Sequence, residues 1–249
     1  MDSKILKLYK NIGETPLECI ERFRLENKEY EETNMTYLGR LDPMAEGLML
    51  VLAGNTKDKD KYLSLDKTYE FEVLWGFETD TYDVLGLVTN TGSMPTKLDF
   101  KMEKLLEEIR EKKTQKYPVY SSKIFNKDFM KVRGKTSELE TPERGIKIFS
   151  IEHINTRLEK QEDVLKEILN KIDLVKGDFR QGEIKERWNN ELGIMNGEKL
   201  LISHFKASVS SGTYIRSLAN EMGQKLGTSA LAYSIKRTWT ATDDCGNKT

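Results

Sequence analysis

The chain has 249 residues, of which 37% are hydrophobic and 33% charged, and its formal net charge is −1. This length suits one large domain or two small ones, and no apolar run is long enough for a membrane span or a signal peptide. The two cysteines, Cys19 and Cys245, lie far apart and only two histidines are present, so we expect a cytoplasmic protein without a disulfide framework or a transition-metal site.

The first half of the chain predicts a helix and then a strand. Thr15, Pro16 and Glu18 have the order of an N-cap, a proline in the first turn and a capping box, so a helix should begin at Pro16. Its expected apolar face is Leu17, Ile20 and Phe23. From Thr68 to Trp75 apolar and acidic side chains alternate, which is typical of a strand with one buried face. The side chains expected on that face are Tyr69, Phe71, Val73 and Trp75.

The second half predicts two more helices and two strands. An amphipathic helix is indicated by the spacing of Leu98, Met102, Leu105, Leu106 and Ile109. Strands are expected at Gly145 to His153 and at Lys199 to Ser210. A helix capped by Thr213 should follow and end near Gly227. Its expected apolar face is Ile215, Leu218, Ala219, Met222 and Leu226.

Residues 157–197 are charge-rich, with basic and acidic side chains nearly in balance. A helix inside this region is marked by Leu165, Ile168, Leu169 and Ile172. Because the strands before and after it could pair directly as a hairpin, we interpret the region as an insertion at a strand connection rather than a second domain. Single helices between strand hairpins predict the α+β class and one domain over residues 1–249.

A basic stretch lies between Lys112 and Lys135. It contains eight basic residues against one acidic residue, Asp128, and Tyr117, Tyr120, Phe125 and Phe129 are interleaved with them. Cations for phosphates and rings for bases suit a nucleic acid, so we expect an RNA-gripping loop here. The alternative is an ordinary solvated charged loop, which charge alone would favour.

The segment TYLGRLDPMAEG, residues 36–47, surrounds a single aspartate with two glycines and a proline. Most such triplets are only turns, because Asp-Pro and Gly are ordinary turn residues. The alternative is a rigid loop that carries a catalytic carboxylate, Asp42. Later segments of the chain favour this second interpretation.

Five motifs follow one another in a fixed order: the loop just described, KTY at 67–69, GFETDTYDVLG at 76–86, QKYPVYSSK at 115–123 and SGTYIRSLANEMGQKLG at 211–227. AYSIKRT at 232–238 follows them. Together they resemble the TruB family of pseudouridine synthases over most of residues 8–156 and 198–240. Each motif is weak alone, but their joint order is specific. The resemblance implies a catalytic domain with a mixed, mainly antiparallel sheet flanked by helices and loops.

The resemblance also implies site residues. Asp42 would be the catalytic aspartate, Tyr69 would stack on the target uracil, and Arg216 would pair with Asp42. The base pocket would be lined by Tyr37, Gly39, Leu41 and Ile235. The residues expected to contact RNA are Lys10, Arg40, Lys67, Lys116, Tyr120, Lys123, Lys127, Lys131 and Arg133. Taken singly, Tyr69 would be a core strand residue and Arg216 a helix arginine in an ordinary salt bridge.

The implied activity is isomerisation of a flipped-out uridine to pseudouridine, at U55 in the T-loop of tRNA. It implies no cofactor and no metal, and we expect a monomer that binds the T-arm of tRNA. One departure from the family pattern is Tyr37, where a histidine is usual, and we further expect no C-terminal RNA-binding PUA domain of the kind that many relatives carry. One alternative is a non-catalytic RNA binder or tRNA folding helper on the same fold. The weakest alternative is a glycoside hydrolase, which uses a pair of carboxylates, whereas the motifs place only one.

Overall fold

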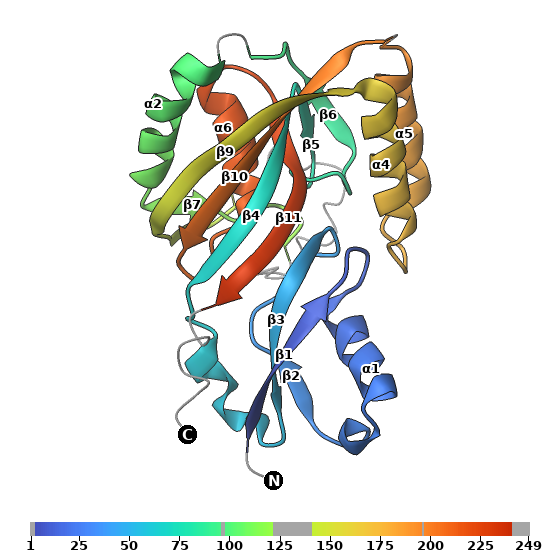
Figure 1. Cartoon of the computed structure of the whole chain (residues 1–249), viewed down its shortest axis with the longest axis vertical. Coiled ribbons are helices and arrows are strands. Elements are labelled where there is room, and N and C mark those ends of the chain that lie inside the picture. Colours follow the sequence, from blue (N-terminus) through green and yellow to red (C-terminus); the bar gives the residue numbers. More distant parts are fainter. Residues whose placement is uncertain (1–2, 96–97, 122–140, 196, 241–249) are drawn as a thin grey trace.

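The computed structural model describes residues 3–95, 98–121, 141–195 and 197–240. A seven-stranded sheet has the order β1-β3-β11-β4-β10-β9, and β2 pairs with β3 (Figure 1). Its strands are β1 (Lys4–Lys10), β2 (Met35–Tyr37), β3 (Ala45–Ala53), β4 (Lys67–Trp75), β9 (Ile148–Lys160), β10 (Lys199–Val209) and β11 (Ala230–Thr240). Every pairing is antiparallel except the short β3–β11 pairing, so the predicted α+β class with a mixed, mainly antiparallel sheet is confirmed.

Helices and two small hairpins surround this sheet. The helices are α1 (Pro16–Glu26), α2 (Leu98–Arg110), α4 (Gln161–Asp173), α5 (Gln181–Gly193) and α6 (Ile215–Lys225), with 3₁₀ turns at Lys28–Tyr30 and Thr56–Tyr62. The hairpins pair β5 (Phe77–Thr79) with β6 (Val88–Thr91) and β7 (Thr114–Lys116) with β8 (Glu143–Gly145). Within the described residues, no helix is both long and apolar enough to cross a bilayer.

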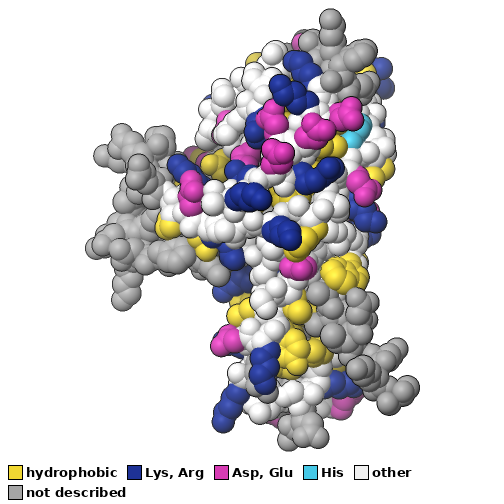
Figure 2. Space-filling model, turned by 90° about the vertical axis from the view of Figure 1, so that its left-hand side faces the viewer, with side chains coloured by type: hydrophobic (Ala, Val, Ile, Leu, Met, Phe, Trp, Pro, Cys, Tyr) yellow, Lys and Arg dark blue, Asp and Glu magenta, His cyan; other side chains and the backbone are white. Residues whose placement is uncertain are grey.

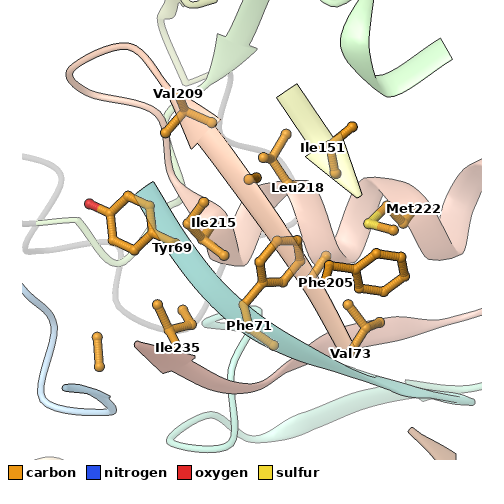
Figure 3. Close-up of a cluster of buried hydrophobic side chains, with 14 of the residues drawn as sticks. Tyr69, Phe71, Val73, Ile151, Phe205, Val209, Ile215, Leu218, Met222 and Ile235 are labelled. Atoms are coloured by element: carbon orange, nitrogen blue, oxygen red, sulfur yellow. The ribbon is translucent and has the colours of Figure 1, made fainter. Parts of the chain in front are cut away.

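Helix α6 covers the sheet where β4, β10 and β11 lie side by side. Phe71 of β4 stacks on Phe205 of β10 with ring centroids 5.4 Å apart. Leu218 and Met222 of α6 point toward these rings, as Figure 3 shows. Tyr69 lies at the end of this cluster, and its hydroxyl points away from the packed side chains (Figure 3). The core therefore fixes the ring while leaving its polar end directed outward.

On the face of the molecule drawn in Figure 2, charges of both signs are mixed among the described residues. Lys and Arg side chains are interspersed with Asp and Glu side chains there, most densely in the upper half of the view. This agrees with the net charge of −1 for the whole chain. The described residues of this face therefore carry no broad field of one sign that would favour a polyanion.

Several predicted elements are confirmed. The capping box at α1 is complete, because Glu18 N donates to Thr15 Oγ1 at 3.2 Å and Thr15 N donates to the Glu18 carboxylate at 2.8 Å. The predicted strand at 68–75 is β4, the helix around Met102 is α2, and Gly227 follows the end of α6 with φ of 73°. The strands on either side of the insertion, β9 and β10, pair as predicted.

Three details of the sequence prediction are wrong. Leu17 is 60% exposed, because the face that α1 buries carries the predicted Ile20 together with Cys19 and leaves Leu17 at its edge. Thr213 is not the cap of α6, since Tyr214 occupies that position and Thr213 Oγ1 donates to Ser210 O. Strand β9 continues to Lys160, past the predicted end at His153, because β10 offers it backbone partners as far as Lys199.

The insertion at 157–197 holds two helices rather than the one that was predicted. The missed helix, α5, buries Ile184, Trp188 and Leu192. These residues are spaced four apart, which makes a narrow apolar stripe between charged residues. In the sequence such a narrow stripe gives only a weak helical periodicity. Its role as a buried face becomes clear only when the partner helix, α4, is known.

Candidate active site

A cavity of about 450 Å³ opens where four distant segments of the chain meet. Its walls are the Asp42 loop, the beginning of β4 with Lys67 and Tyr69, the segment 211–216 that enters α6, and Ile235 of β11. The Asp42 loop and Arg216 lie 174 positions apart in the sequence. Folding therefore assembles the three residues predicted to be catalytic, Asp42, Tyr69 and Arg216, around one cavity.

The Asp42 loop is held by backbone contacts on both sides. Gly13 N donates to Pro43 O at 2.9 Å, and Ala45 N donates to Asp42 O at 2.9 Å. Buried Arg237 donates to Gly39 O and Arg40 O, both at 3.3 Å. The loop is thus fastened before and after its carboxylate, as a rigid catalytic loop would require and an ordinary surface turn would not.

Arg216 positions the carboxylate of Asp42. The Arg216 side chain is 4% exposed and its Nε donates to Asp42 Oδ2 at 2.8 Å, whereas the Asp42 side chain is 39% exposed. Arg216 also donates to Thr81 O at 2.5 Å and to Tyr120 O at 3.3 Å. A guanidinium with several fixed acceptors cannot rotate freely, so it holds one oxygen of Asp42 while the carboxylate stays open to the cavity.

Asp83 supports Arg216 from the buried side. Its Oδ2 lies 3.5 Å from Arg216 Nε, and its Oδ1 accepts hydrogen bonds from Thr81 Oγ1 and Leu85 N. Burial raises the pKa of Asp83 to about 6, although the Arg216 charge opposes this rise. Burial likewise opposes the charge on Arg216, but the carboxylates of Asp42 and Asp83 together raise its pKa. The cation between two carboxylates is therefore permanent.

The predicted base pocket also lies at this cavity. Tyr37, Gly39, Leu41 and Ile235 all line it, together with Tyr69. Tyr69 is 7% exposed and lies within the core cluster, so its ring position is fixed by packing. The Tyr37 ring lies 5.6 Å from the Arg40 guanidinium, a cation–π distance. The cavity thus presents aromatic and aliphatic walls with one carboxylate between them.

Basic side chains lie around the same cavity. Arg40, Lys59, Lys67 and Arg144 line it. Lys67 is buried and its Nζ donates to Leu65 O. Burial, with the nearby charge of Arg237, lowers the pKa of Lys67 to about 8. The cavity therefore combines an apolar interior with a positive surround, as an anionic polymer carrying a planar base would require.

The other predicted RNA contacts are more dispersed. Lys116 is exposed on β7, and Tyr120 lies beside Arg216 rather than in the cavity wall. Lys10 does not fit its predicted contact, because it is fully buried and its Nζ donates to Asn11 O and Glu14 O. Burial lowers the pKa of Lys10 to about 8. Lys123, Lys127, Lys131 and Arg133, with most of the basic stretch, lie outside the described residues.

The sequence model described as TruB family pseudouridylate synthase (N terminal domain) matches residues 27–179, which is more than half of the chain. This chain belongs to the TruB family. The match includes the Asp42 loop, Tyr69 and Asp83, while Arg216 lies beyond it.

Proteins named tRNA pseudouridine synthase B are similar to this TruB-family chain over nearly its whole length. The protein from Aquifex aeolicus (strain VF5) is 28% identical over 239 residues, which cover 95% of this chain and 68% of that protein. The one from Bacillus subtilis (strain 168) is 28% identical over 241 residues, covering 96% and 65%. The chain thus spans about two thirds of the length of these relatives.

Solved structures share the fold of this TruB-family chain. One, a Cbf5-Nop10-Gar1 complex, aligns with a TM-score of 0.55 at 18% identity, over 95% of this chain and 48% of that chain. Another, an H/ACA RNP bound to a substrate RNA containing 2′-deoxyuridine, aligns with a TM-score of 0.51 at 18% identity, over 95% and 47%. At these identities the likeness establishes the fold.

Several residues of this TruB-family site had not been predicted individually. Asp83 and Thr81 lie in the TDTYD motif, whose two acids and threonines were the available signal. Gln115 was available from the QKYP motif, and its side-chain amide exchanges two hydrogen bonds with the Tyr214 backbone beside Arg216. Arg144 belongs to no motif that was recognised, and only the fold brings it to the cavity.

Proposed function

We propose that this TruB-family protein is a tRNA pseudouridine synthase that acts on U55 in the T-loop, with Asp42 as its catalytic carboxylate. The observation that carries the proposal is the pair formed by Asp42 and Arg216 at the wall of a cavity that also contains Tyr69. Relatives named tRNA pseudouridine synthase B support tRNA as the substrate.

The proposed reaction breaks the N1–C1′ bond of uridine, turns the base and forms a C5–C1′ bond, while C5 releases its proton to solvent and N1 takes one up. Asp42 would attack C1′ as a nucleophile or remove the 2′ proton as a base. Either role needs an ionised carboxylate with a fixed direction, which Arg216 supplies by donating to Oδ2. The other oxygen of Asp42 is then available to the sugar.

The cavity walls would receive the uracil after it leaves the RNA stack. Unstacking costs a few kcal/mol, and stacking on the Tyr69 ring recovers part of that cost. The Tyr69 phenol would lie near C5 and assist proton exchange there, directly or through water. Tyr37 would provide a second ring in place of the histidine usual in the family.

Phosphates of the RNA would be held by basic side chains near the cavity mouth. Arg40 and Lys67 line the cavity, and Lys116 is exposed on β7. Lys123, Lys127, Lys131 and Arg133 would extend this contact along the RNA. Because phosphate contacts release counterions, we expect tRNA affinity to fall steeply between low and physiological salt.

Tritium release from tRNA transcripts labelled at uracil C5 tests the proposal. Wild type should release tritium, and replacing the T-loop uridine by cytidine should remove that release. Asp42→Asn should bind tRNA with unchanged affinity and release none. The matched control is Glu46→Gln, which makes the same change of carboxylate to amide at a residue outside the cavity wall that accepts from Tyr9.

Glu46→Gln should therefore release tritium at the wild-type rate. An Asp42→Asn variant as active as wild type would rule out the catalytic role of Asp42. Tight tRNA binding by wild type without any release would instead support an RNA-binding or tRNA-folding role on this fold.

A further inference from the structure

The inserted helix α5 packs directly against the turn that supports Arg216. Trp188 of α5 is fully buried and its Nε1 donates to Val84 O at 3.1 Å. Arg187 Nε donates to Val88 O at 3.2 Å. Residues 80–87 form the turn between β5 and β6, and Thr81 and Asp83 within it contact Arg216. Because charges within the insertion nearly balance, its role is better sought in these contacts than in RNA attraction.

Arg180 lies between the two inserted helices and reaches into this turn. Its Nη1 donates to Asp80 Oδ2 at 2.8 Å, while Leu87 N donates to Asp80 Oδ1 at 2.9 Å. The Arg180 backbone has φ of 63°, which is uncommon for a residue other than glycine. The side-chain contact with Asp80 therefore offsets a backbone conformation that an arginine does not favour.

Arg180 also contacts Tyr120, on a segment remote from the turn. The Arg180 guanidinium lies 4.8 Å from the centre of the Tyr120 ring, and Arg180 Nη1 donates to the Tyr120 hydroxyl at 3.4 Å. The Tyr120 carbonyl accepts from Arg216, as does the carbonyl of Thr81, the neighbour of Asp80. Arg180 thus links the two segments that supply the backbone acceptors of Arg216.

The same insertion touches Gly13, which holds the loop of Asp42. Leu174, which follows α4, lies so close to Gly13 that a Cβ on Gly13 would be 2.5 Å from Leu174 O. The N–H of Gly13 holds Pro43 O, directly after Asp42. The insertion therefore borders the supports of both members of the Asp42–Arg216 pair.

We propose that Arg180 is a positioning residue, which joins the Asp80 turn to Tyr120 and so fixes the guanidinium of Arg216 against Asp42. It would act through other residues, because within the described part of the chain its guanidinium contacts Asp80 and Tyr120. Its catalytic consequence rests on the proposed function, whereas its effect on Arg216 does not.

Single-turnover tritium release separates positioning from folding, since the amplitude measures the competent fraction and the rate constant measures the geometry. Arg180→Ala should lower the rate constant about tenfold or more, because small displacements at a reacting centre have effects of this order. The amplitude and the tRNA dissociation constant should stay within twofold of wild type. Arg180→Lys should recover part of the rate, because it keeps one cationic donor for Asp80.

The matched control is Lys185→Ala, which removes an ion pair with Asp173 from the surface of the same insertion. It should keep the wild-type rate constant. A loss of amplitude at an unchanged rate constant in Arg180→Ala would overturn the proposal, because Arg180 would then only stabilise the fold.

A second measurement does not depend on activity. The ¹⁵N–¹H signal of Arg216 Nε can be assigned by its disappearance in Arg216→Lys, and its exchange with water measures how firmly Arg216 is held. That exchange should accelerate about tenfold in Arg180→Ala and stay unchanged in Lys185→Ala. Unchanged exchange in Arg180→Ala would overturn the proposal. Accelerated exchange in a protein that releases no tritium would support it while refuting the proposed function.

Discussion

Replacing Arg216 by alanine should destabilise the protein, because the buried carboxylate of Asp83 would lose its partner cation. Asp83 is 5% exposed and keeps its hydrogen bonds from Thr81 and Leu85 in this variant, but it loses the guanidinium 3.5 Å away. Removing one partner of a buried ion pair costs about 3–5 kcal/mol, because the remaining charge stays in a poor solvent. We expect the free energy of unfolding of Arg216→Ala to fall by about that amount at pH 8.

The cost should depend on pH in a defined direction. Burial raises the pKa of Asp83 to about 6, above its ordinary value of 3.8, and Arg216 restrains this rise. A raised pKa means that stability is fully present below the unfolded-state value and is lost as the pH rises through the folded-state value. Without Arg216 the folded-state pKa rises further, so the variant loses more stability than wild type at pH 8. The difference between them should shrink toward pH 5, where Asp83 is protonated.

Urea unfolding at pH 5 and pH 8 measures this effect. Wild type, Arg216→Ala and the double variant Arg216→Ala/Asp83→Asn would be compared. At pH 8 the double variant should be more stable than the single variant by about 1–3 kcal/mol, because the unpaired charge is gone. A cost below about 1 kcal/mol at pH 8, or a cost that does not change with pH, would refute the pairing argument.

Two further predictions concern Lys67 and Gly47. The tRNA affinity would be measured in an Asp42→Asn background, which prevents turnover. Between pH 7 and pH 9 this affinity should weaken about fivefold more in the protein with Lys67 than in the Lys67→Arg variant. The reason is that lysine loses its charge over this range and arginine does not, and the charged contact is worth about 1 kcal/mol. The pKa of Lys67 is lowered to about 8, so parallel pH curves in a filter-binding assay would contradict its role at a phosphate. Gly47→Ala should lower the free energy of unfolding by about 2–4 kcal/mol, because alanine disfavours positive φ and crowds its neighbours. Gly47 has φ of 109°, and a Cβ added to it would lie 2.3 Å from Arg237 O. The control is Gly193→Ala, because a Cβ added to Gly193 would meet no neighbouring atom within 4 Å. This control should be nearly neutral in the same urea titration.

The sequence determined those features that depend on neighbouring residues. The capping box of α1 needs only Thr15 and Glu18, three positions apart, and the alternation of β4 follows from the period of a strand. The ordered motifs predicted the family and the residues that meet at the cavity, Asp42, Tyr69 and Arg216. These are local patterns, which the chain carries before it folds.

The tertiary structure decided which of these residues touch and which lie apart. Arg216 meets Asp42 across 174 positions, and only the fold adds Asp83 as a second carboxylate behind it. Lys10 resembles a surface cation in the sequence, yet pairing of β1 with β3 and the backbone carbonyls of the following turn bury it. Burial, charge pairing and the contact of the inserted Arg180 with Asp80 arise from distances between remote segments, and those distances exist only once the sheet has assembled.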